Sequence, residues 1–198
     1  MSSQALRAAI ARKSKESAAA QEQFFAENTE RILECCTSMA RAFDQGAKLL
    51  AMGNGGSACD AQHVVVEFAH PIIEKRPALP ALSLTTDAAL LTAVGNDEDF
   101  SLSFARQLRL LGKKGDIAFG ISTSGKSASV NRALVAAREI EMLAVGLSGR
   151  DGGRMRETCD FCFTVPSYST HRIQEVHATL IHVIWDLIHV IRGQEDVL

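Results

Sequence analysis

The sequence predicts an α/β protein, a three-layer sandwich around a central five-stranded parallel sheet. Two observations predict this class: short apolar runs alternate with helical patterns, and three of the runs end in Gly/Ser-rich turns. Right-handed crossovers between parallel strands place all the carboxyl ends at one edge of the sheet. We therefore expect the three turns to face one crevice, where such sheets bind ligands.

The elements follow in chain order. Residues 4–44 are rich in Ala, Glu and Lys with apolar residues at helical spacing, which predicts two helices or one broken helix ending near Gly46. The predicted strands are Lys48–Met52, Ala81–Leu84, Asp116–Ile121, Leu143–Leu147 and Phe161–Val165. One helix is expected after the turn Gly53–Ser57, through about Phe68. The other helices are expected at Ala88–Val94, Leu102–Leu111, Ala128–Glu139 and His171–Arg192.

No linker or internal repeat divides the chain, so we expect a single domain over residues 1–198. Within it, residues 1–46 are expected to form a helical extension and residues 47–168 the α/β core. Residues 169–193 are expected to form a long C-terminal helix that contributes to the active site. The predicted arrangement is flavodoxin-like, with N-terminal helices beside the core.

Composition excludes several function classes. The net charge is −2 and the chain has one Trp and one Tyr, so no nucleic-acid partner is expected. The longest apolar stretch, Val176–Ile191, contains His and Asp, so no membrane span is expected. Met1–Arg12 lacks the apolar run of a signal peptide, which predicts a cytoplasmic protein with reduced cysteines. Cys159 and Cys162 are expected in the core, on opposite faces of the last strand.

The turn Gly120–Ser127 lies between a predicted strand and a predicted helix. Free backbone N–H groups and the helix dipole favour an anion there. The segment also matches the nucleotide-binding pattern G-x-x-x-x-G-K-[ST], which keeps a P-loop NTPase as an alternative. That class needs an Asp at the end of an apolar strand to hold Mg²⁺, and Asp87 is a poor candidate.

A similar turn, Gly53–Ser57, follows the first predicted strand. Its glycines allow a ligand to approach the backbone, and Ser57 with Asp60 has the form of a helix capping box. Such glycines can also serve only to make a tight turn. Two such turns in one small domain favour a phosphorylated small molecule as ligand.

Two helices carry residues suited to metal binding or acid–base work. His63 and Glu67 are four residues apart and therefore share a helix face. Gln174 and His182 are eight residues apart, about 80° around the helix, and can point toward one site. An exposed helix face and a structural histidine are the alternatives from spacing alone.

With these residues in view, the chain resembles the sugar isomerase (SIS) domain proteins and, among them, the phosphoheptose isomerases. The resemblance covers nearly the whole chain. It rests on the motifs Gly53-Asn54-Gly55-Gly56-Ser57, Asp60-Ala61-Gln62-His63, Arg76-Pro77, Gly95-Asn96-Asp97, Gly120-Ile121-Ser122-Thr123-Ser124-Gly125, Gly149-Arg150-Asp151-Gly152-Gly153 and Arg172-Ile173-Gln174-Glu175.

The resemblance implies an intramolecular oxidoreductase that interconverts sedoheptulose 7-phosphate and D-glycero-D-manno-heptose 7-phosphate through an enediol. This reaction is the first step of ADP-heptose biosynthesis. The resemblance also implies a homotetramer with active sites at subunit interfaces, one zinc ion per subunit and no nucleotide cofactor.

The resemblance assigns roles to residues of this chain. It makes Glu67 and His182 the groups that move the proton. It implies that zinc is held by His63, Glu67, Gln174 and His182. It implies that the substrate is bound by Asn54, Gly55, Gly56, Glu67, Asn96, Asp97, Ser122, Thr123, Ser124, Ser127 and Gln174.

The chain departs from the family pattern at three places. His70-Pro71 stands where many relatives have Gly-Arg, Lys126 replaces a common Asn, and His171 stands where relatives often have Asp or Ala. A non-catalytic SIS protein that binds sugar phosphates or a partner, like the branch associated with the replication initiator, is the second alternative. The presence of both Glu67 and His182 favours the enzyme.

Overall fold

A computed structural model describes residues 2–73 and 75–196, and its centre is a sheet of five parallel strands. The strands are β1 (Leu49–Gly53), β2 (Ala81–Ser83), β3 (Ile117–Ser122), β4 (Leu143–Gly149) and β5 (Phe161–Val165). Their spatial order is β2-β1-β3-β4-β5, which is the flavodoxin-like order. The predicted fold class is confirmed, and the strand order reverses between β1 and β3.

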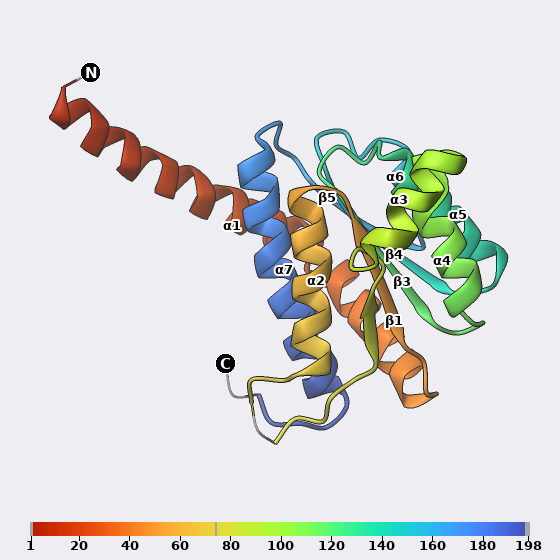
Figure 1. The fold of residues 1–198 in the computed structure, drawn as a ribbon. Coiled ribbons are helices and arrows are strands. Elements are labelled where there is room, and N and C mark those ends of the chain that lie inside the picture. Colours follow the sequence, from red (N-terminus) through yellow and green to blue (C-terminus); the bar gives the residue numbers. More distant parts are fainter. Residues whose placement is uncertain (1, 74, 197–198) are drawn as a thin grey trace.

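Helices cover both faces of the sheet, which gives three layers (Figure 1). One face packs against α1 (Ser3–Asp44), α2 (Gly56–Ala69) and α7 (Thr170–Ile191). The other face is covered by α3 (Ala88–Asp97), η1 (Phe100–Leu102), α4 (Ser103–Leu111), α5 (Ala128–Glu139) and α6 (Met155–Thr158).

Side-chain alternation along β1 builds both halves of the core. Leu49 and Ala51 belong to the cluster under α1, α2 and α7, whereas Leu50 and Met52 belong to the cluster under α4 and α5. All five residues of the strand are buried, as expected for a central parallel strand covered by helices on both faces.

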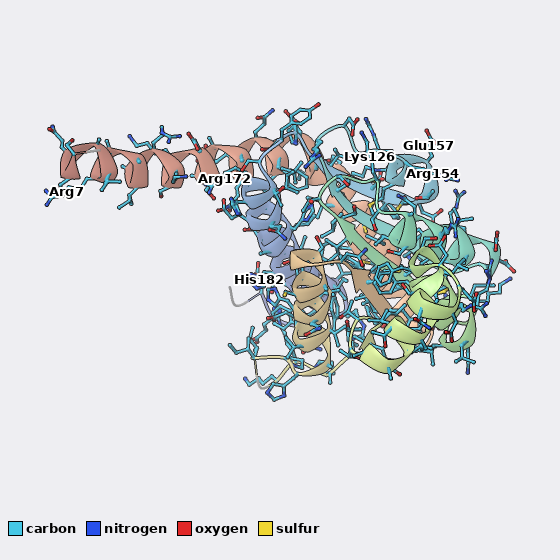
Figure 2. All side chains as sticks on the ribbon, turned by 45° about the horizontal axis from the view of Figure 1, so that its top comes forward. Arg7, Lys126, Arg154, Glu157, Arg172 and His182 are labelled. Carbon is cyan, nitrogen blue, oxygen red and sulfur yellow. The ribbon has the colours of Figure 1, made fainter. Side chains whose placement is uncertain are left out.

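The N-terminal segment is one continuous helix, so the prediction of two helices or a broken helix is wrong. Residues 3–44 contain no Gly or Pro, and nothing in the sequence therefore interrupts the hydrogen-bond ladder. Helix α7 makes hydrogen bonds to Lys13, Ser17 and Gln21 of α1, and the buried residues of α1 begin at Phe24. The part before Lys13 projects from the body as an arm with Arg7 near its tip (Figures 1 and 2).

The two cysteines of the Cys-x-x-Cys segment pack against the same half of the core, so their prediction on opposite faces is wrong. Cys159 lies in the turn after α6, two residues before β5 begins, and strand alternation does not apply to it. Both side chains contact the cluster that contains Met155. All five cysteines are free thiols, as expected.

None of the described helices combines the length and hydropathy needed to cross a bilayer. The last helix, α7, nevertheless buries polar groups. His177 is fully buried, and its Nε2 lies 2.9 Å from the carbonyl oxygen of Ser148 at the end of β4. Burial lowers the pKa of His177 to about 4, although the hydrogen bond to Ser148 raises it.

This histidine makes the stability of the fold sensitive to acid. The pKa of His177 is 6.5 in the unfolded chain and about 4 in the folded one, so between these values the unfolded state binds more protons. Its contribution is complete above pH 6.5 and is lost as the pH falls toward 4, by up to about 1.4 kcal/mol per pH unit. Urea unfolding at pH 7 and pH 5 is expected to show a smaller pH dependence for His177→Asn than for the wild type. The exposed His70→Asn is the control, and an unchanged dependence in His177→Asn contradicts the assignment.

Candidate active site

The turns after β1 and β3 meet at the point where the strand order reverses. The Asn54 side chain donates hydrogen bonds of 2.9 Å to the hydroxyls of Ser127 and Ser129. The third turn joins them, because the backbone N–H of Met155 donates to the Gly125 carbonyl over 3.1 Å. The three turns therefore meet at one edge of the sheet, and the ligand crevice expected there stays a prediction. We call the segment Ser122–Ser127 the phosphate cradle, after the role predicted for it.

The helices that follow these turns begin without side-chain caps. Helix α2 starts after Gly55, which has a φ of 58°, so the predicted capping box of Ser57 and Asp60 is wrong. Ser127 precedes α5, but its hydroxyl binds Asn54 and not the backbone of its own helix. Uncapped helix starts at a shared edge favour an anionic ligand.

Hydroxyl groups line the phosphate cradle. Ser122 is buried at the end of β3, and Thr123, Ser124 and Ser127 are half-buried. The Ser124 hydroxyl accepts a hydrogen bond from the Lys126 backbone over 3.2 Å. This arrangement can donate several hydrogen bonds to one phosphate group.

The residues that a nucleotide site would need are engaged elsewhere. Lys126 Nζ lies 3.0 Å from Asp151, and both side chains are more than half exposed. Figure 2 shows Lys126 beside Arg154 and Glu157, away from His182. Asp87 caps α3 by accepting a hydrogen bond of 2.9 Å from the Leu90 backbone. The geometry therefore counts against the NTPase alternative.

Three potential metal ligands converge between α2 and α7. His63 Nε2 lies 3.2 Å from Glu67 Oε1 and 3.0 Å from His182 Nε2, and His182 Nε2 lies 4.0 Å from Glu67 Oε1. We call these three residues the triad. His63 and Glu67 share a face of α2, as their spacing predicted, and the structure brings His182 of α7 to the same place.

The triad fits a divalent metal such as zinc. Ligand atoms about 2.0–2.1 Å from a tetrahedral ion are separated by roughly 3.3 Å, and the three observed separations lie around that value. The ligand set of two imidazoles and one carboxylate is common for zinc. The side chains are partly exposed, which leaves room for a substrate oxygen at a fourth position.

Gln174 lies near the start of α2. A Cβ atom added to Gly56 would lie 2.2 Å from the Gln174 Nε2, so the amide rests directly on the glycine backbone. This contact places Gln174 beside the first turn of α2. Its role as a metal ligand stays a prediction.

Gly56→Ala is expected to displace the Gln174 amide and to raise the KM for substrate. Two heavy atoms cannot approach to 2.2 Å, and a side chain is easier to move than the backbone of α2. Kinetics of the two single variants and the double variant Gly56→Ala/Gln174→Ala measure the coupling. The double variant is expected to resemble Gln174→Ala. Independent, additive effects would show that Gly56 does not act through Gln174.

Asn96 and Asp97 lie at the end of α3 and are exposed. The Asn96 side chain donates a hydrogen bond of 2.7 Å to Asp97 Oδ1. Among the described residues, no hydrogen bond links Asn96 or Asp97 to the cradle or to the triad. Their role in substrate binding stays a prediction.

Sequence reasoning missed the position of Asp60. It lies one turn before His63 on α2, with Oδ2 buried and without a recorded partner in the described chain. Burial raises the pKa of Asp60 to about 6, and the nearby His63 opposes that shift. The i, i+3 spacing of Asp60 and His63 was the available signal.

Comparisons with known proteins identify the family of this chain. The SIS domain family model matches residues 14–149. The phosphoheptose isomerase of Desulfovibrio desulfuricans is 51% identical over 166 residues, which cover 84% of this chain and 79% of the relative. That of Thermodesulfovibrio yellowstonii is 43% identical, with 92% and 88% covered.

Two solved structures have the same fold. The phosphoheptose isomerase of Neisseria gonorrhoeae has a TM-score of 0.86 and 40% identity, and the match covers 92% of this chain and 98% of that one. The Francisella tularensis enzyme has a TM-score of 0.89 and 33% identity, with 96% and 100% covered.

The fold and the site thus define a SIS domain protein. Within that class, the chain belongs to the phosphoheptose isomerase family, whose members are isomerase enzymes.

Proposed function

We propose that this enzyme interconverts sedoheptulose 7-phosphate and D-glycero-D-manno-heptose 7-phosphate, the first step of ADP-heptose biosynthesis. The observation that carries the proposal is the placement of the triad relative to the phosphate cradle. Helix α2 begins beside the cradle and carries His63 and Glu67 about two and three turns further on. A phosphate held in the cradle leaves the sugar chain to extend along α2 toward Glu67 and His182.

The proposed chemistry needs one base and one group that exchanges a proton with oxygen. Glu67 takes the proton from the carbon next to the carbonyl, which gives an enediol. The protonated Glu67 exchanges this proton with solvent and then delivers a proton to the neighbouring carbon. His182 moves a proton between the two sugar oxygens. Each proton removed is replaced, so the reaction is a net isomerisation.

We propose that the site holds one zinc ion per subunit, bound by His63, Glu67, Gln174 and His182. An atom bound to zinc cannot also carry the proton, so Glu67 would act through its other carboxylate oxygen and His182 through its other ring nitrogen. When bound, zinc polarises the carbonyl and stabilises the negative charge of the enediolate. We expect elemental analysis to find one zinc per chain in the wild type and much less in His63→Gln. Chelation followed by zinc add-back should abolish and restore turnover. Full turnover by metal-free protein would contradict this part of the proposal.

We also propose a cytoplasmic homotetramer with active sites at subunit interfaces. The arm of α1 exposes Leu6 and Ile10, and Val66 is 51% exposed on α2 between His63 and Glu67. Exposed apolar side chains on the arm and beside the site suit contacts with further copies of the chain. Sedimentation equilibrium measures the assembly, and a monomer at micromolar concentration would contradict it.

The function is tested by incubating sedoheptulose 7-phosphate with the protein and identifying the products by NMR. We expect the heptose 7-phosphate aldose to form until equilibrium. Phosphate binding without any product would instead favour the non-catalytic SIS alternative. Parallel reactions with sugar phosphates of five and six carbons measure how selective the enzyme is for the length of the sugar. This selectivity matters because His70-Pro71 stands where many relatives have Gly-Arg.

A further inference from the structure

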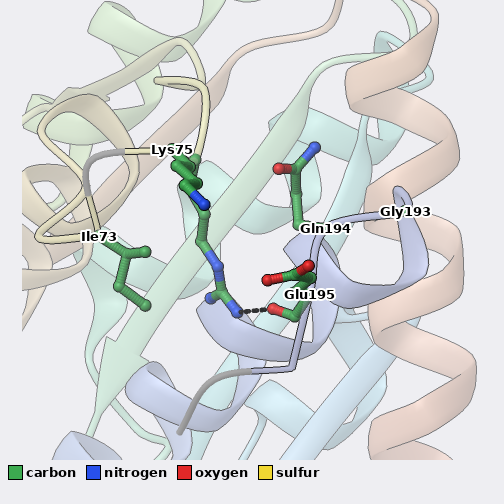
Figure 3. A pocket seen from close by; sticks show the side chains of 6 residues that line it. Ile73, Lys75, Gly193, Gln194 and Glu195 are labelled. Carbon is green, nitrogen blue, oxygen red and sulfur yellow. Dashed lines mark hydrogen bonds between the residues drawn. The ribbon is translucent and has the colours of Figure 1, made fainter.

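A cavity of about 230 Å³ lies between two segments that are remote in sequence. Ile73, Lys75 and Arg76, from the connection between α2 and β2, form one side, and residues 193–195, which follow α7, form the other (Figure 3). The cavity lies beyond the last turn of α2, whereas the phosphate cradle lies beside its first turn. The two places are therefore separate.

Arg76 forms the inner wall of this cavity, and its side chain is only 2% exposed. Its Nη2 lies 2.6 Å from Asp186 Oδ1 and donates a 3.0 Å hydrogen bond to the Glu195 carbonyl, the dashed line in Figure 3. The guanidinium also lies over the Trp185 ring, 4.7 Å from its centroid. These contacts fix the position of the cation.

Two donor atoms of this buried cation lack a hydrogen-bond partner in the described chain. Arg76 Nε and Nη1 are both buried and have no hydrogen-bond partner among the described residues. A buried donor without a partner costs about 1–3 kcal/mol, more when it is charged. Such groups in a folded protein call for an explanation, and a bound acceptor is a common one.

The size and charge of the cavity limit what it can accept. A volume of about 230 Å³ is below the roughly 300–1,000 Å³ of sites for drug-sized ligands, so the occupant is a small group. Lys75 adds a second cation at the rim. Among the described lining residues the exposed Glu195 side chain carries the negative charge, and behind the lining Asp186 pairs with Arg76. Several acceptor oxygens on one small anion match the unpartnered donors of an arginine.

We propose that this cavity is a second anion site, which binds a monophosphate group. Arg76 is the buried anchor and Lys75 the cation at the rim. The phosphate is either the free ion or part of a small phosphorylated metabolite, since both present the same oxygens to Arg76. The site does not depend on the proposed isomerase substrate, because no residue of the cradle or the triad lines it.

The chain contains its own reporter for this site. Trp185 is the only tryptophan, is 2% exposed and lies against Arg76. Binding that alters the guanidinium position should therefore change the tryptophan fluorescence. Binding in the phosphate cradle involves a different set of residues.

The test is a fluorescence titration of the full chain with inorganic phosphate, and in parallel with glycerol 3-phosphate and acetate, at constant ionic strength. We expect a saturable change with phosphate, glycerol 3-phosphate or both, and acetate to be at least tenfold weaker. Saturation by inorganic phosphate identifies the free ion as sufficient. Saturation by glycerol 3-phosphate alone identifies a phosphorylated metabolite.

Variants decide where the ligand binds. The change should persist in Thr123→Ala/Ser124→Ala, disappear in Arg76→Gln, and need several-fold more phosphate in Lys75→Ala. Circular dichroism checks that Arg76→Gln is folded, and Lys75→Ala decides the outcome if it is not. The proposal is overturned by the absence of saturation with either phosphate, by a response lost in the cradle variant, or by an unchanged response in Arg76→Gln or in Lys75→Ala.

Discussion

Glu67→Gln is expected to lower kcat by about 10²–10⁴-fold, the range that general acid–base catalysis contributes. The amide has nearly the shape of the carboxylate but cannot accept the proton from the sugar carbon. KM is expected to change little, because in the proposed complex the phosphate is held by the cradle at the start of α5, away from Glu67. Steady-state kinetics with sedoheptulose 7-phosphate measure both parameters.

Two controls separate catalysis from metal loss and from general effects of the substitution. Glu157→Gln removes an exposed carboxylate on α6, away from the triad, and should leave kcat unchanged. Zinc content measured alongside shows whether Glu67→Gln still holds metal. Wild-type turnover by a folded Glu67→Gln variant would remove Glu67 from the mechanism.

Gly125→Ala is expected to have the second large effect, on stability and on phosphate affinity together. Gly125 has a φ of 64°, and an added Cβ would lie 1.9 Å from the Gly152 carbonyl oxygen. This oxygen belongs to the backbone, so the cradle and the turn after β4 must move apart. We expect the free energy of unfolding to fall by about 2 kcal/mol or more and KM to rise.

Gly115→Ala is the matched control for this substitution. Gly115 has a φ of 86° but no atom within 4 Å of an added Cβ. It therefore measures the cost of the left-handed backbone alone, about 1–2 kcal/mol, without the clash. Denaturant unfolding compares the two variants. Equal losses would show that the contact between the two turns does not matter for stability.

The parallel sheet and its binding edge could be predicted because their signals are local. An apolar run followed by a Gly/Ser turn identifies the carboxyl end of each strand, and β5 and α5 begin and end at the predicted residues. The topology rules then bring the turns together. The pair His63 and Glu67 was visible for the same reason, since four residues span one helical turn.

The remaining features depend on tertiary contacts that leave no pattern in the sequence. The capping box failed because the N-cap of α2 is Gly55, two residues before Ser57. Cys159 was misplaced because the four-residue helix α6 is too short to show a period. The Arg76 cavity requires residue 76 to meet residues 185, 186 and 195. The sequence alone contains no spacing that links these positions.

The most direct measurement of the central claim is the transfer of solvent deuterium to the sugar. Sedoheptulose 7-phosphate is incubated with the zinc-loaded enzyme in D₂O, and the aldose is examined by proton NMR. An enediol route with Glu67 as base predicts deuterium at C2 of the aldose and a much slower exchange with Glu67→Gln. Formation of the aldose with no deuterium at C2, or deuterium uptake unaffected by Glu67→Gln, would contradict the account.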